Sequence, residues 1–262
     1  MDINQIKSKN RVLDYGEVLT PSWLVNKMLD LIPREGTKIS SRYLENSSGE
    51  GAFLLGILNR KLELIFNTYS DTKDREFYTI VGIANIYGLE LLKDNVEVSK
   101  SRLLDLVEDY FTSRYEIKTD LRFFGVIAHI INVNIMNMDA LAYKTPLFNN
   151  NELLKDNNGN IVYSNELGKI SEWEIDYKTR EIKRVEYYYR DIVQEQEDHF
   201  YYEKMLKTTE PLQLSLFESD KENDLFDFDT YVRVAKPYRI FEKTSYINLV
   251  DAIIVEDGDL NE

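Results

Sequence analysis

Three acidic residues in the first half of the chain have the chemistry and the surroundings needed to bind a nucleoside. Glu45 opens the stretch Glu45-Asn-Ser-Ser-Gly-Glu-Gly51, whose glycines permit positive φ and a close approach of the backbone to a ligand. Glu90 ends a short apolar run, where an acid can bind both ribose hydroxyls. Asp139 ends another such run and could accept a hydrogen bond from an adenine amino group. Together these residues predict a nucleoside-binding site.

Each of these features also has a purely structural interpretation. A glycine turn can simply close a strand-turn-helix unit, and Asp139 can cap a helix that follows it. Glu90 lies 39 positions after Gly51, whereas the acid of a dinucleotide site follows its glycines by about 20 residues. An insertion must therefore separate the two motifs.

The elements that would position the three acids alternate between strand and helix. Apolar residues at helical spacing predict a first helix over 21–32, with Thr20 as its cap. The other expected elements are strands at 41–44, 86–89 and 134–138 and helices at 52–65, 78–86 and 91–107. Strands that alternate with helices and each end on a carboxylate predict an α/β fold with a mostly parallel sheet.

The second half of the chain has a different character. The segment 149–160 is rich in Asn, Asp and Gly and predicts a loop or turn. Alternation over 168–189 predicts an antiparallel pair of strands. The segment 194–229 is strongly acidic, which favours an extended or partly disordered region. We therefore expect three parts: a core at 1–148, a β-hairpin extension at 149–192 and an acidic, partly extended region at 193–262.

Four motifs of the first half occur in an order that is typical of one enzyme family. They are Gly16-Glu-Val-Leu-Thr-Pro21, Tyr43-Leu-Glu-Asn-Ser-Ser-Gly-Glu-Gly-Ala-Phe-Leu54, Ile86-Tyr-Gly-Leu-Glu-Leu91 with Asp94-Asn95 and Arg102-Leu103, and Asp139-Ala-Leu141. In this order they resemble the adenine-specific DNA methyltransferases of restriction-modification systems. The resemblance covers residues 14–141 and implies a Rossmann-like class I methyltransferase core, with helices on both faces of the sheet and S-adenosylmethionine as cofactor.

The resemblance also implies a role for individual residues. Thr20 and Pro21 would contact the methionine end of the cofactor, Glu45, Ser47, Gly49 and Gly51 would surround it, Glu90 would hold the ribose, and Asp139, beside Ala140, would hold the adenine.

The chain departs from the family at two motifs. The family's glycine motif usually reads Glu-Pro-Ala-Cys-Gly-x-Gly, and here Asn46 replaces the proline and Ser47-Ser48 replace Ala-Cys, so we expect reduced affinity for the cofactor. The catalytic tetrapeptide, Asn/Asp/Ser-Pro-Pro-aromatic, is missing, since no Pro-Pro occurs in the chain. Its polar residue would accept from the target amine while its aromatic ring stacks on a flipped base. Ser171 and Trp173 are the candidates for these roles, and a partner chain is the alternative source.

A pentapeptide in the acidic segment has a form that suggests a protein partner. Gln213-Leu-Ser-Leu-Phe217 has the form of the peptides that dock on the bacterial sliding clamp: Gln213 is followed by the apolar anchors Leu214, Leu216 and Phe217. The alternative is a few apolar residues that pin a loop to the domain.

A run of tyrosines at 187–189, flanked by basic residues, has two interpretations. The rings could stack on single-stranded bases, or they could belong to a half-buried hairpin, which is the interpretation that we favour.

The composition limits the classes of protein that remain. The chain has 262 residues, no cysteine, only two histidines and a net charge of -14. No apolar run approaches the roughly 20 residues that span a bilayer, and no thiolate metal site or disulfide can form, so we expect a cytoplasmic protein without a metal. The acidic charge argues against a protein that grips DNA over its whole surface.

Three hypotheses therefore stand. The first is a DNA adenine methyltransferase, or the methyltransferase subunit of a restriction-modification system. The second is a catalytically inactive protein that binds the cofactor and docks on DNA-bound partners such as the sliding clamp. Methylation of a small molecule ranks third.

Overall fold

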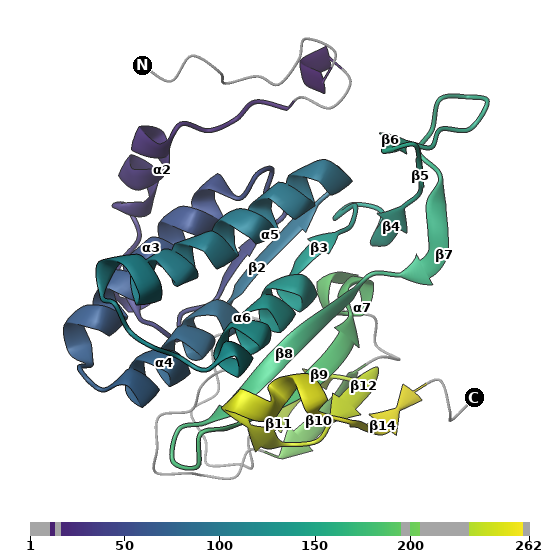
Figure 1. The fold of residues 1–262 in the computed structure, drawn as a ribbon. Helices are drawn as coiled ribbons and strands as arrows, with labels where there is room; N and C mark the ends of the chain where they lie inside the picture. The colour runs from purple at the N-terminus through teal and green to yellow at the C-terminus, as the bar shows by residue number, and fades with distance from the viewer. Residues whose placement is uncertain (1–10, 14–16, 195–199, 205–230, 259–262) are drawn as a thin grey trace, which may run out of the picture.

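A three-stranded parallel sheet forms the centre of the first half of the chain (Figure 1). The computed structural model describes residues 11–13, 17–194, 200–204 and 231–258. The strands are β1 (Tyr43–Glu45), β2 (Ile86–Glu90) and β3 (Ile135–Asn137), in the order β1-β2-β3. Glu45 is paired with Gly88, and Glu90 with Asn137, so the carboxyl ends of the strands meet at one edge. The three predicted strands and their parallel arrangement are confirmed.

Helices fill the connections between the strands. They are α2 (Ser22–Leu29), α3 (Ala52–Thr68), α4 (Thr72–Ala84), α5 (Lys93–Glu108), its π-helical continuation η2 (Asp109–Arg114) and α6 (Leu121–Asn134), with a 3-10 turn η1 (Arg34–Thr37) before β1. The prediction that α4 begins near Tyr78 is wrong. It begins six residues earlier because Asp71 accepts hydrogen bonds from the backbone N–H groups of Lys73 and Asp74.

The start of α2 also differs from the prediction. Pro21, with φ -64° and ψ 145°, is the N-cap residue, and no side chain caps the helix, so Thr20 does not have the capping role. The helix packs closely on α3 because residue 56 is a glycine. A Cβ built there would lie 2.8 Å from Leu29 Cδ1 and 2.9 Å from Val25 Cγ1.

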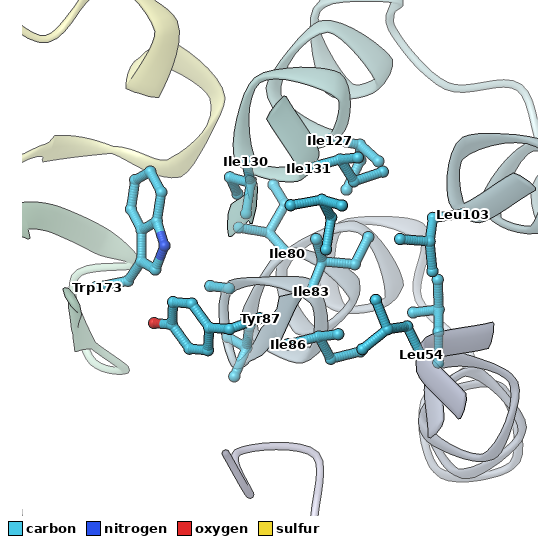
Figure 2. Packing of buried hydrophobic residues seen from close by; sticks show 14 of the residues in the cluster. Leu54, Ile80, Ile83, Ile86, Tyr87, Leu103, Ile127, Ile130, Ile131 and Trp173 are labelled. Carbon is cyan, nitrogen blue, oxygen red and sulfur yellow. The ribbon is translucent and has the colours of Figure 1, made fainter. Parts of the chain in front are cut away.

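The two faces of the parallel sheet are covered differently. Ile86 and Ile135 face side chains from α3, α4, α5 and α6, among them Leu58 and Leu103. Successive side chains of a strand point to opposite faces, and the ring of Tyr87 points toward Trp173 of the second half of the chain (Figure 2). Trp173 belongs to a strand, Lys169–Asp176, so the side chain that Tyr87 faces comes from a strand, whereas the resemblance implied a helix on this face.

The second half forms an antiparallel sheet. β8 (Lys169–Asp176) pairs with β9 (Glu181–Tyr188) along its whole length, which confirms the predicted pair at 168–189. Its other elements are α7 (Tyr189–Gln194), β12 (Arg239–Phe241), β13 (Thr244–Ser245), η4 (Tyr246–Asp251) and β14 (Ile254–Asp257). Because β12 and β13 pair with β9, the segment 239–257 belongs to this sheet and not to a separate acidic region.

A narrow arm of short strands connects the two sheets. It consists of β4 (Lys144–Pro146), β5 (Phe148–Asn149), β6 (Glu152–Leu153) and β7 (Tyr163–Leu167), in the pairs β4-β7 and β5-β6. The arm projects from the body of the molecule (Figure 1). A further antiparallel pair joins β10 (Phe200–Lys204) to β11 (Tyr231–Ala235).

A buried lysine stabilises the connection between α3, α4 and β1. Lys61 of α3 is 3% exposed, and its Nζ donates to the carbonyl oxygens of Ser41 at 2.7 Å and Gly82 at 3.0 Å. Gly82 lies in the last turn of α4, where carbonyls lack helical partners. Burial lowers the pKa of Lys61 to about 7.

Candidate functional site

Two adjoining cavities lie at the carboxyl ends of β1 and β2. Cavity A, of about 500 Å³, lies between the end of β1, α2, α3 and α5. Cavity B, of about 400 Å³, lies beside the ends of β2 and β3. Val18, Leu19, Ser47 and Gly49 line both, so the two cavities share a wall. Each volume is in the range of small-molecule sites, about 300–1,000 Å³.

The structure brings together residues that the sequence had selected from four separate motifs. Cavity A is lined by Thr20, Pro21 and Glu45, cavity B by Glu90, Asp139 and Ala140, and both by Ser47 and Gly49. Gly51 lines neither cavity and is the N-cap residue of α3. The reason for the gathering is the sheet: strands that run in parallel bring their carboxyl ends, and the loops after them, to one edge.

The turn between β1 and α3 depends on its two glycines. Gly49 has φ 52° and Gly51 has φ 76°, the left-handed region that other residues rarely adopt. The turn closes through bonds from Ser48 N to Leu89 O, 3.0 Å, and from Gly51 N to Ser48 O, 2.8 Å. A Cβ on Gly49 would meet no atom within 4 Å, which leaves space for a ligand beside the backbone.

The Glu90 carboxylate stabilises the glycine turn through hydrogen bonds. Its Oε2 accepts from Gly49 N at 2.8 Å, and its Oε1 accepts from Leu92 N at 2.9 Å and Asn95 Nδ2 at 3.4 Å. A carboxylate oxygen can accept about two hydrogen bonds, so Oε2 can still accept one. Glu90 therefore holds the glycine turn in place and still has an acceptor for a ligand hydroxyl.

Glu45 has an unsatisfied oxygen in the same site. Its Oε2 is buried and has no hydrogen-bond partner in the part of the chain that the structure describes. Burial, followed by the charge of nearby Glu90, raises the pKa of Glu45 to about 7. A buried polar atom without a partner in the protein suggests a partner from outside it, and a cation would favour the ionised form of this carboxyl.

Asp139 has more internal partners than the sequence indicated. Its Oδ1 accepts from the N–H groups of Leu141 at 2.8 Å and Ala142 at 3.1 Å, and its Oδ2 accepts from the Tyr163 hydroxyl at 2.6 Å. The cap interpretation describes these contacts, although the capped element is a turn and not a helix. Asp139 still lines cavity B, where a ligand donor would share Oδ2 with Tyr163.

The sequence did not select Glu17 or Asn95 for the site, and both line cavity B. Asn95 Nδ2 donates to Glu17 Oε1 at 2.7 Å, and Arg11 bonds to Glu17 and, at 2.7 Å, to Asp94. This network holds the segment around Val18 across the shared wall of the cavities. Both residues lie in the matched motifs, but spacing alone gave neither a role.

The two catalytic candidates do not lie in the cavities. Trp173 is 3% exposed, and its Nε1 donates to Asn134 Oδ1 at 2.9 Å. Ser171 is 5% exposed, and its Oγ accepts from Arg184 Nε at 3.0 Å. Trp173 therefore bonds to the core, whereas Ser171 bonds within the second sheet.

Replacing Trp173 with phenylalanine should therefore reduce stability and leave ligand binding intact. The change leaves the buried Asn134 oxygen without its donor, which costs about 1–3 kcal/mol. Urea unfolding measures the loss, and calorimetry measures binding. Trp23→Phe is the control, because Trp23 is 57% exposed on α2. Lost binding at unchanged stability would place Trp173 back in the site.

The two expected contact surfaces of the second half have different outcomes. The Gln213–Phe217 peptide lies outside the described residues, so its docking role stays a prediction. Tyr187 and Tyr188 lie in β9, as the hairpin interpretation predicted, whereas Tyr189 begins α7. Tyr187 and Tyr189 are buried, which leaves their rings inaccessible to bases. Among residues 11–13, 17–194, 200–204 and 231–258, no group of acidic or histidine side chains is arranged to hold a metal, and no helix is long and apolar enough to cross a membrane.

Comparison of the chain with protein-family models, with curated proteins and with solved structures gave no match. Its functional interpretation therefore rests on the chemistry of cavities A and B and on the order of its motifs.

Proposed function

We propose that this chain binds S-adenosylmethionine in cavities A and B and serves as the methyltransferase subunit of a DNA adenine methyltransferase from a restriction-modification system. The observation that carries the proposal is the pair of joined cavities at the glycine turn. Glu45, whose buried Oε2 has no hydrogen-bond partner among the described residues, lines one cavity, and the strand-end acids Glu90 and Asp139 line the other.

Cavity B suits the nucleoside end of the cofactor. Leu91, Leu92 and Met138 provide apolar surface for a flat base. Glu90 has one acceptor left for a ribose hydroxyl, and Asp139, which lines the same cavity, would accept from the amino group of the base. The same cavity would suit any adenine nucleoside, so cavity B alone does not select the cofactor.

Cavity A suits the other end because the carboxyl group of Glu45, which lines it, can pair with a positive charge. The sulfonium and ammonium groups of S-adenosylmethionine are cations, and the ionised form of Glu45 would pair with one of them. When bound, the cofactor would supply an electrophilic methyl group, while the chain would orient it and hold its ends. An uncharged nucleoside would leave Glu45 without a partner.

The substrate is proposed from the resemblance and from the acidic surface together. The ordered motifs point to adenine in DNA, whereas a net charge of -14 opposes phosphate binding by the chain alone. Because Ser171 and Trp173 are buried outside the cavities, the residues that accept from the target amine and stack on the base would come from a partner chain. That burial also favours a second candidate, a catalytically inactive cofactor-binding protein.

Titration calorimetry tests the shared part of both candidates. The chain should bind S-adenosylmethionine, and Glu90→Ala should lose binding because it removes the ribose acceptor and the partner of Gly49 N. Glu166→Ala, an exposed change on β7, is the matched control. No binding by the unchanged chain would contradict both candidates.

Methyl transfer from labelled cofactor to bacterial DNA separates the candidates. We expect transfer only when the product of a neighbouring gene is added. Cofactor binding with no transfer under either condition would favour the inactive protein.

A further inference from the structure

Arg102 is the one cationic side chain among the described residues that line cavities A and B. It projects from α5, is 45% exposed and lines cavity A. All other charged side chains that line cavities A and B are carboxylates: Glu17, Glu45, Glu50, Glu90 and Asp139. Within the part of the chain that the structure describes, an anionic group on a ligand in these cavities would therefore meet one full positive charge.

The guanidinium of Arg102 is held in place but not saturated. Its Nη1 donates to the carbonyl oxygen of Glu50 at 2.8 Å, and the Glu50 carboxylate lies 3.9 Å away, beyond hydrogen-bond distance. Arginine has five N–H donors. Anchoring through one of them fixes the direction of the side chain and leaves others for a ligand, which is the preorganised fork that suits a carboxylate.

The first turn of α3 adds to this positive region. Ala52 and Phe53 line cavity A, and no side chain caps the helix at Gly51. The unpaired N–H groups of a helix start favour an anion. Cavity A thus combines a cationic region at Arg102 and the start of α3 with the anionic Glu45, an arrangement that is complementary to the ammonium and carboxylate of an α-amino acid.

We propose that Arg102 binds the α-carboxylate of the ligand in cavity A and so selects nucleosides that carry a complete amino acid over those that have lost the carboxylate. The proposal rests on the proposed function, since it concerns the same cavity. It adds a residue that the motifs left without a role, and it predicts a discrimination that Glu45 and Glu90 cannot provide, because an acid does not attract a carboxylate.

The test compares two ligands that differ only in the carboxylate: S-adenosylmethionine and its decarboxylated form. By calorimetry the unchanged chain should bind S-adenosylmethionine more tightly. Arg102→Met should weaken its binding about ten- to a hundredfold, the range expected for a charge-assisted hydrogen bond, and leave the decarboxylated ligand unchanged. Arg102→Lys should keep part of the preference because it keeps the charge without the fork. Arg122→Met, which removes an exposed charge at the start of α6, is the matched control.

The outcomes distinguish this proposal from the proposed function. Equal losses for both ligands would overturn the carboxylate role and leave Arg102 as a support for the Glu50 turn. No change for either ligand would overturn it as well. If the unchanged chain bound neither ligand, the proposed function itself would fail. Thermal unfolding of each variant shows whether a loss comes from the fold.

Discussion

The affinity of the chain for S-adenosylmethionine should fall about eightfold from pH 7.5 to pH 6. The reason is Glu45, whose pKa burial and the neighbouring Glu90 raise to about 7. Below that pH the carboxyl is protonated, and a cationic ligand must displace the proton before it can pair. Binding measured by calorimetry across this range, in buffers of matched ionic strength, gives the profile.

Glu45→Gln should flatten this profile and weaken binding at pH 7.5, because the amide carries no charge to pair with the cation. Glu97→Gln removes an exposed carboxylate from α5 and should keep the profile of the unchanged chain. If the affinity of the unchanged chain and that of Glu45→Gln changed equally with pH, the role of this carboxyl would be contradicted.

The same carboxyl predicts how the stability of the ligand-free chain changes with pH. Its pKa in the folded state is higher than its ordinary value of 4.5, so its contribution to stability is present below pH 4.5 and is lost as the pH rises through 7. Glu45→Gln should therefore unfold at a higher temperature than the unchanged chain at pH 8, provided that the amide fits the same space.

Gly51→Val should cost about 3 kcal/mol or more of folding free energy and abolish cofactor binding. The φ of 76° disfavours a branched side chain, and a Cβ there would lie 2.3 Å from Ser99 Oγ of α5. Backbone strain and overpacking each cost about 1–3 kcal/mol. The expected fall in unfolding temperature is about 10 °C for a chain of this size, and binding should fail because the turn and the start of α3 shift together.

Gly49→Ala is the informative comparison for that variant. Gly49 shares the left-handed conformation, with φ 52°, but an added Cβ meets nothing within 4 Å. We expect a smaller loss of stability, about 1–2 kcal/mol, together with weaker binding, because the methyl group enters the shared wall of the cavities. If the two variants were equally stable, the contact with Ser99 would not be the cause. Adding Ser99→Ala to Gly51→Val should then restore no stability.

The sequence predicted most of the first half because its signals are local. Helical periodicity marks α3 and α5, and short apolar runs that end in an acid mark β1, β2 and β3. Parallel strands bring their ends to one edge of the sheet, so the sequence pattern alone predicts that Glu45, Glu90 and Asp139 lie near each other. The late start predicted for α4 shows the limit: its first turn is polar, and its signal is the cap at Asp71.

The second half was predicted less completely because its contacts are distant in sequence. The hairpin of β8 and β9 has a clear alternating pattern, whereas β12 reaches β9 across some fifty residues, a distance at which no local pattern specifies a partner. The same reason explains Trp173: its type and position suggested chemistry, and only the packing of β8 against the end of α6 makes it a buried donor to Asn134.

By itself, the sequence determined the order of the motifs, the strands that end in acids, and the glycines of the turn, because these depend on residue type and neighbouring positions. Tertiary structure alone decided which carboxylate oxygens are already occupied. Glu90 and Asp139 are bonded to N–H groups and a hydroxyl of the chain, whereas Oε2 of Glu45 is buried and has no partner among the described residues. It also decided that Arg102, 57 positions from Glu45, lines the same cavity. Hydrogen-bond partners and burial depend on distances in space that spacing in the chain does not specify.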